Sequence, residues 1–140
     1  MEFIKPLNEI FIQDNTFYTS LTIYSKSIYN GILASPPCNE IFKLLIIYII
    51  NINKNFLELD YLAFCSQIYI IISHYIGQQP KKPGNYLTYI GSNNNIILFQ
   101  EVCDCSLHSD LKPDRYGFCS KIYDSNNNII FNNRYYDYPW

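Results

Sequence analysis

The sequence predicts an α/β (α+β) fold over residues 1–140, with a mixed sheet, two main helices and C-terminal β-hairpins. Three observations lead to this prediction. The length of 140 residues suits a single domain. Hydrophobic residues make up 49% of the chain and aromatic residues 17%, which is enough to bury a core. Segments with strand character lie before and after two segments with helical periodicity, which favours a layered α/β or α+β domain over a bundle or a sandwich.

Two strands are expected in the first quarter of the chain. Residues 17–24 read FYTSLTIY and residues 28–35 read IYNGILAS, and both are rich in the β-branched and aromatic residues that favour strands. Pro36 and Pro37 end the second strand because proline has no N–H to donate to a sheet. Residues 2–13 mix strand and turn character, and residues 14–16 read as a turn.

Two helices follow. The first is predicted over residues 39–53, where apolar residues recur at helical spacing at Ile41, Leu44, Leu45, Tyr48 and Ile52. The second is predicted from about Asp60, a suitable N-cap, to Tyr75, with Gly77 as its stop signal. Its inward stripe would comprise Leu62, Cys65, Ile68, Ile72 and Tyr75. Its other face is also rather apolar, so we expect this helix to be covered on more than one side.

The last part of the chain predicts two β-hairpins. Residues 86–91 and 96–102 flank an Asn-rich turn, and residues 118–124 and 128–136 flank a second one. A polar loop, residues 103–115, lies between the hairpins.

Composition excludes some functions and suggests a source. The formal net charge of −2 argues against a nucleic-acid partner, because phosphate binding needs a surplus of Lys and Arg. No signal peptide and no apolar run of about 20 residues is visible, so no transmembrane segment is expected. The 23 Ile and 16 Asn against 2 Ala suggest an AT-rich genome, such as that of a low-GC virus, a protist or a bacterium. A viral source would place the protein in the cytoplasm of an infected cell, but the sequence leaves the compartment unknown.

Few residues predict chemistry directly. No phosphate-binding glycine motif and no nucleophile elbow occurs, so no catalytic residue is assigned. Cys103, Cys105, His108 and Cys119 do not follow a common zinc spacing, so no metal site is expected in this chain.

One polar segment and one aromatic segment are candidates for binding. Asp114 and Arg115 form either a turn with a local ion pair or the rim of a pocket, where Arg115 would contact an anionic group such as a diphosphate. Residues 134–140, RYYDYPW, either stack on sugar rings or cap the core. The sequence does not decide between these interpretations.

Several segments taken in order resemble the C-terminal portion of glycosyltransferases of the DXD sugar-binding type, the family 32-like group. These segments are residues 4–7 (IKPL), residues 30–37 (NGILASPP) before a helix, and the two hairpins after the second helix. Residues 114–117 (DRYG) and 133–140 (NRYYDYPW) are similar to the ends of such proteins from giant viruses and microbial eukaryotes. The resemblance implies a GT-A-like fold and hexosyl transfer from a nucleotide sugar to a glycan or protein acceptor. It implies that Asn30, Ser35, Asp114 and Arg115 contact the substrate.

The chain departs from that family in two places. The DXD motif, with which the family holds a divalent metal (Mn²⁺) and the donor diphosphate, is absent, so no cofactor is expected in this chain itself. Many relatives carry T-G-P at the start of the following helix, where this chain has residues 64–67 (FCSQ). We therefore expect the acceptor-side half of such an enzyme, inactive alone, with an upstream half supplying the donor site. The alternative is a non-catalytic module that binds a glycan or a protein.

Overall fold

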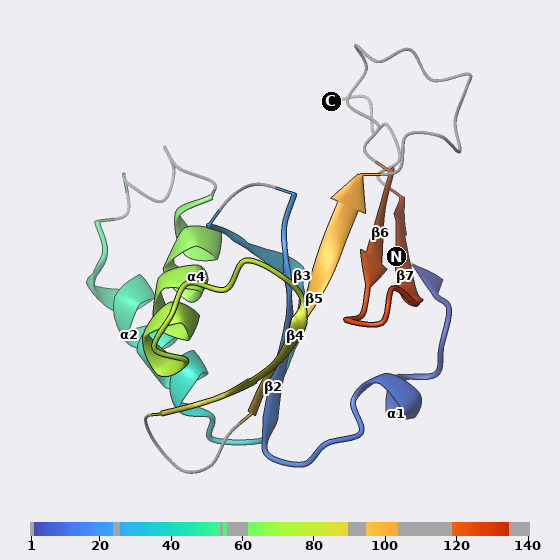
Figure 1. Ribbon diagram of the computed structural model, residues 1–140. Coiled ribbons are helices and arrows are strands. Elements are labelled where there is room, and N and C mark those ends of the chain that lie inside the picture. Colours follow the sequence, from blue (N-terminus) through green and yellow to red (C-terminus); the bar gives the residue numbers. More distant parts are fainter. Residues whose placement is uncertain are drawn as a thin grey trace.

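The computed structural model describes residues 2–23, 26–53, 55, 62–89, 95–103 and 119–134. These residues form a mixed α+β fold, in which a seven-stranded sheet carries two helices, α2 and α4, on one face (Figure 1). The predicted mixed sheet with two main helices is therefore confirmed. Within the described residues, no helix has the length and hydropathy needed to cross a bilayer.

The sheet contains both parallel and antiparallel pairs. Its strands are β1 (Glu2–Phe3), β2 (Thr16–Leu21), β3 (Ile28–Ala34), β4 (Gly84–Leu87), β5 (Asn95–Cys103), β6 (Cys119–Tyr123) and β7 (Ile129–Arg134). They are ordered β1-β7-β6-β5-β2-β3, and β4 also pairs with β5. The first half of β5 pairs with β4 and its last residues pair with β6, so the antiparallel pairing of both predicted hairpins, β4–β5 and β6–β7, is confirmed. The predicted bounds of the first strand, residues 86–91, were wrong, because β4 begins at Gly84 and ends at Leu87.

The central pair of strands is parallel. β2 and β5 run side by side, from Thr16 beside Asn95 to Leu21 beside Gln100. All six residues of β2 are buried, because a parallel strand at the middle of a sheet is covered on both faces. The carboxyl ends of both strands lie at one edge of the sheet, which we call the carboxyl edge, and their amino ends lie at the opposite, amino edge.

The helices begin and end at local signals. They are α1 (Leu7–Ile10), α2 (Glu40–Asn51) and α4 (Ala63–Tyr75). At the start of α2, the Oδ1 of Asn39 accepts a hydrogen bond from the Ile41 N–H at 2.9 Å. Gly77, with φ +66°, turns the chain away after α4, which confirms its predicted role as a stop signal.

Three details of the helix predictions were wrong. The N-cap of α4 is Leu62, and not Asp60, which lies outside the described residues. Leu62 was predicted to face inward but is exposed. It precedes the first turn of α4 and therefore does not lie on the buried face of that helix. Leu44 of α2 is exposed too, whereas Ile41 and Leu45 are buried as predicted.

The core has two parts, one on each face of the sheet. Side chains alternate along a strand, so Phe17 of β2 packs under the helices while Tyr18 faces the other side. The helix-side core contains the predicted residues Ile68, Ile72 and Tyr75. The opposite core is built mainly from β2, β3, β5, β6, β7 and α1; its buried residues are Ile10, Tyr18, Tyr29, Ile32, Phe99, Ile122, Ile130 and Phe131.

The turn between β6 and β7 is built on one aspartate. The Oδ1 of Asp124 accepts hydrogen bonds from the backbone N–H groups of Asn126 and Asn128, both at 2.8 Å. Asn127 takes a left-handed conformation, with φ +61°. Partial burial would raise the pKa of Asp124, but the hydrogen bonds from Asn128 and Asn126 and the charge of Lys5 outweigh it and lower this pKa. The predicted Asn-rich turn is therefore an Asp-anchored one.

Candidate functional site

A hollow of about 400 Å³ opens beside α4. Its lining residues are Lys26, Ser66, Tyr69, Ile70, Ser73 and Gln79. Four of these six residues come from α4, at the i, i+3, i+4, i+7 spacing that places them on one helical face. Lys26 belongs to the turn that leaves the carboxyl end of β2, so the hollow borders the carboxyl edge of the sheet.

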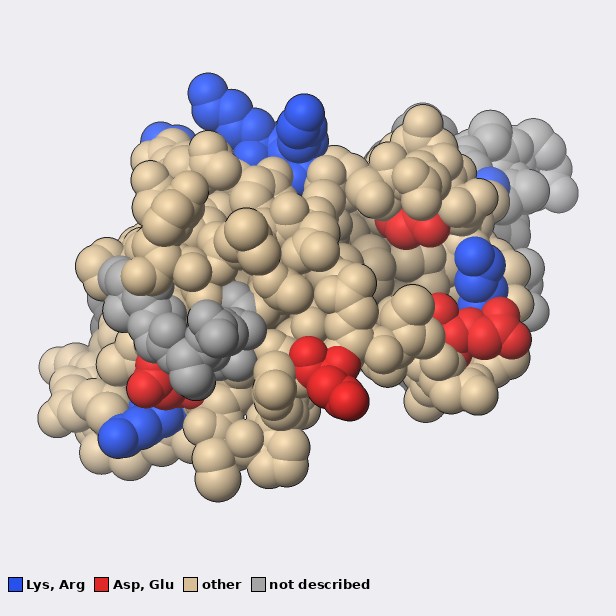
Figure 2. All heavy atoms as spheres, turned by 60° about the horizontal axis from the view of Figure 1, so that its bottom comes forward, with Lys and Arg blue, Asp and Glu red and all other residues tan. Residues whose placement is uncertain are grey.

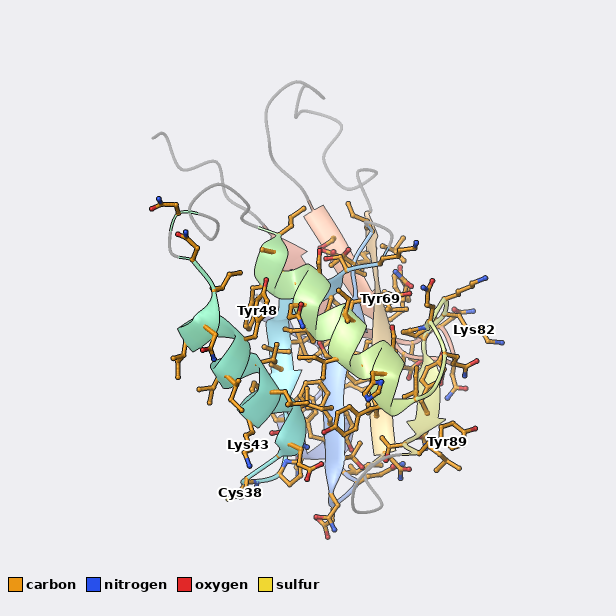
Figure 3. All side chains as sticks on the ribbon, turned by 90° about the vertical axis from the view of Figure 1, so that its left-hand side faces the viewer. Cys38, Lys43, Tyr48, Tyr69, Lys82 and Tyr89 are labelled. Carbon is orange, nitrogen blue, oxygen red and sulfur yellow. The ribbon has the colours of Figure 1, made fainter. Side chains whose placement is uncertain are left out.

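The chain folds back after α4 to form one wall of the hollow. Tyr69 is buried, and its Oη donates a hydrogen bond to the carbonyl oxygen of Pro80 at 3.1 Å. The backbone N–H of Gln78 bonds to the carbonyl oxygen of Ser73 at 3.1 Å. Figure 3 shows Tyr69 on the side of α4 that is turned towards the segment of Lys82. These bonds hold the loop that carries Gln79 against the helix.

The two serines of the hollow offer oxygen atoms on the α4 surface. The Oγ of Ser73 donates to the carbonyl oxygen of Tyr69 at 2.7 Å, four residues earlier in the helix. That bond uses the hydroxyl proton of Ser73 and leaves its lone pairs as acceptors. Ser66 and Ser73 are both half-buried, so ligand contacts there would be partly shielded from water.

The hollow is lined by polar and apolar side chains together and has no acidic lining residue. Its lining offers one ammonium, two hydroxyls, one amide, one aromatic ring and one aliphatic side chain. Lys26 is exposed and has a left-handed backbone, with φ +58°. Lys81 and Lys82, just after Pro80, are exposed as well. On the face shown in Figure 2, one group of basic side chains lies at the top rim, and other basic side chains lie beside acidic ones at the lower left and at the right. The chemistry therefore suits a ligand rich in hydroxyl groups, or one with an anionic group.

A buried carboxylate lies at the same edge but on the opposite face of the sheet. Glu101 is near the end of β5 and only 7% exposed. Its Oε1 accepts a hydrogen bond from the Ser120 Oγ at 2.7 Å, and its Oε2 accepts one from the Ile23 N–H at 3.4 Å. A buried carboxylate needs such donors. These bonds fasten the start of β6 and the chain after β2 to β5, which makes Glu101 an anchor of the carboxyl edge.

Of the substrate-binding residues predicted from the sequence, the structure describes the side chain of Ser35, and it lies away from this hollow. Ser35 follows the end of β3, at the amino edge, and its Oγ donates to the carbonyl oxygen of Pro36 at 3.0 Å. Cys103 ends β5 and Cys119 begins β6, both at the carboxyl edge. Because each strand residue adds about 3.3 Å, these two residues lie roughly 20 Å from Ser35 along the strand direction. The structure therefore separates Ser35 from both ends of the segment 104–118.

The side chains of the other three predicted residues lie outside the described part of the structure. Asn30 lies within β3, but its side chain is outside the described part of the structure. Asp114 and Arg115 lie outside the described residues, as does the aromatic segment 135–140. Their predicted roles as substrate contacts remain predictions.

Sequence reasoning missed the residues that line the hollow. Ser66 and Ser73 are seven residues apart on an otherwise apolar helix, and this spacing was the available signal for a polar patch. Lys26 and Gln79 gave no signal, because their contribution depends on how a turn and a loop approach α4.

The structure does not offer a metal site in the part that it describes. No group of three His, Cys, Asp or Glu side chains among the described residues is placed to hold a metal ion. The DXD motif is also absent from the sequence. The residues present therefore do not fit the divalent metal that the resemblance implies, and we derive no step through one. Comparison of the chain with protein-family models, curated proteins and solved structures found no significant match.

Proposed function

We propose that this chain is a glycosyltransferase-like, GT-A-like unit whose hollow beside α4 binds the acceptor glycan. One observation carries the proposal: a hollow of about 400 Å³, lined by both polar and apolar side chains, borders the carboxyl edge of the parallel pair β2 and β5. In open sheets with parallel strands, ligands bind outside the carboxyl ends of those strands. The volume falls within the range of about 300–1,000 Å³ that is usual for small-molecule sites.

The lining matches the surface of a sugar. Ser66 and Gln79 offer hydroxyl and amide groups that donate and accept hydrogen bonds, as sugar hydroxyls require, and the Oγ of Ser73 offers an acceptor. Ile70, which is 58% exposed, presents an apolar surface to the C–H face of a sugar ring. Lys26 would contact a hydroxyl or an anionic substituent at the rim.

The resemblance adds a role to this site. In the related glycosyltransferases, the acceptor-side half orients the hydroxyl that attacks the nucleotide sugar, and such orientation is a large part of catalysis. Ser66 lies where many of them carry the T-G-P segment. Because the DXD motif is absent, the proposal assigns this chain acceptor binding and no step that involves the donor or Mn²⁺.

Titration of a glycan panel tests the proposal. Binding of mono- and oligosaccharides to the purified 140-residue chain would be measured by ligand-observed NMR and calorimetry. A Ser66→Ala/Ser73→Ala variant is expected to bind the best glycan at least about tenfold more weakly, since two hydrogen bonds are lost. Thr88→Ala is the matched control, because Thr88 also carries a half-buried hydroxyl but follows β4 at the amino edge. The absence of any glycan binding, or an equal loss in both variants, would contradict the proposal.

A second candidate is a non-catalytic glycan-binding module, which the absent DXD motif favours. The two candidates differ in donor chemistry. A panel of nucleotide sugars with Mn²⁺ would be tested for binding and hydrolysis by the isolated chain, and we expect little or no hydrolysis. Weak donor binding at the same hollow supports a glycosyltransferase origin, whereas glycan binding without any donor binding supports the module.

A further inference from the structure

The outward side of α2 is a patch of aliphatic side chains. Only Ile41 and Leu45 of this helix are buried. Ile46, Ile47 and Ile50 are 55%, 46% and 75% exposed. Leu44 and Ile49 flank them and are also exposed. We call these five residues the α2 face.

The α2 face forms a continuous stripe. Lys43, Ile46, Ile47 and Ile50 follow the i, i+3, i+4, i+7 spacing on the side away from Ile41 and Leu45. Figure 3 shows α2 as the outer of the two helices, with Lys43 near its start. The five side chains together expose on the order of 500 Å² of aliphatic surface, as much as the largest apolar patches of ordinary monomers, which are often functional.

We propose that a second copy of this chain packs against the α2 face to form a symmetric dimer. A standard interface buries about 800 Å² on each partner. The aliphatic patch supplies more than half of this area, and the stem of Lys43 together with Phe42 and Asn51 at the border adds to it. An interface at the lower end of the usual size range is typical of weak association, so we expect a dissociation constant in the micromolar range. A two-fold axis between Ile46 and Ile47 makes the stripe complementary to itself.

Charge selects the antiparallel orientation of the two helices. The last turn of α2 contains no basic residue, so the partial negative charge of its final carbonyl groups is not balanced within the helix. In the antiparallel arrangement, Lys43 of each copy lies beside Ile50 and Asn51 of the other and supplies that positive charge. A parallel arrangement would instead place the two Lys43 side chains together.

Sedimentation equilibrium over a range from about 1 µM to 1 mM, wide enough to bracket a micromolar interface, tests the dimer. Ile46→Glu places two carboxylates near the two-fold axis and is expected to raise the dissociation constant at least tenfold. Leu87→Glu is the matched control, because Leu87 is an aliphatic residue 72% exposed on β4. It should leave the constant unchanged. Thermal melting of both variants checks that they fold.

A charge exchange tests the orientation. Lys43→Glu should weaken the dimer, because it brings a negative charge to the negative end of the partner helix. Adding Asn51→Lys should restore most of the affinity, since residue 43 lies beside residue 51 of the other copy only in the antiparallel arrangement. A wild-type chain that stays monomeric at every concentration would overturn the proposal. So would equal effects of Ile46→Glu and Leu87→Glu, a double variant no better than Lys43→Glu, or a monomer that binds neutral lipid vesicles through the α2 face.

Discussion

The helices α2 and α4 are nearly equal in length and both are rich in isoleucine, yet they differ sharply in burial. Seven of the 13 residues of α4 are buried, against two of the 12 residues of α2. Figure 3 shows the reason: α4 lies between α2 and the segment that leads to β4, whereas α2 is the outer helix. An apolar composition thus indicates that the surface of a helix favours burial. The position of the helix in the layer decides whether other parts of the same chain bury that surface.

Replacement of isoleucine by alanine should give the largest difference in the free energy of unfolding between the two helices. Ile72 of α4 is fully buried, so Ile72→Ala is expected to lower the free energy of unfolding by about 2–5 kcal/mol. Ile50 of α2 is 75% exposed, and Ile50→Ala should change it by less than about 0.5 kcal/mol. Urea denaturation at low micromolar protein concentration measures both values for the monomer. Similar losses for the two variants would contradict the difference in burial.

The starts of the two helices provide a smaller test. Asn39 caps α2 through its side chain, whereas α4 has no side-chain cap at Leu62. Asn39→Ala should cost about 1 kcal/mol, because the Ile41 N–H loses its partner.

Asn39→Ser is the matched control for that change. The serine Oγ can replace the capping oxygen, and the Nδ2 of Asn39 is buried without a partner among the described residues, so its removal should cost nothing. Asn39→Ser is therefore expected to stay within a few tenths of a kcal/mol of the wild type. Equal destabilisation by alanine and serine, measured by urea denaturation, would show that the cap contributes little.

The fold was predictable where one local pattern dominates. Helical spacing identified Ile68 and Ile72 as core residues, and turn residues marked both hairpins. The pattern failed for Leu44, because α2 carries isoleucine or leucine on almost every side and periodicity cannot then distinguish inside from outside.

The candidate site was much less predictable than the fold. Ser66 and Ser73 share a helical face and could be inferred from their spacing. Lys26 and Gln79 join them only through the course of a turn and a loop that lie 53 positions apart in the chain. Such a combination depends on tertiary contacts, such as the bond between Tyr69 and Pro80, which no local pattern encodes.

The smallest expected effect concerns the bond that joins the two helices. The Oη of Tyr75 in α4 donates to the Oε2 of Glu40 in α2 at 3.2 Å. Burial, and then the hydrogen bond and charge of Glu40, raise the pKa of Tyr75 above its usual value of 10.0. A tyrosine with a raised pKa in the folded state contributes stability that is complete below pH 10 and is lost as the pH rises through the folded value. Tyr75→Phe should therefore cost about 0.5 kcal/mol at pH 7 and less at pH 11.

Urea denaturation at pH 7, 9 and 11 would follow this loss in the wild type and the variant. Every other residue is the same in both proteins, so the difference between the two curves isolates Tyr75. Glu40→Gln keeps an acceptor for the hydroxyl but removes the charge, and it should give an alkaline slope between those of the wild type and Tyr75→Phe. If all three slopes coincide, the bond does not couple α2 to α4, and the helix-side core alone holds the outer helix in place.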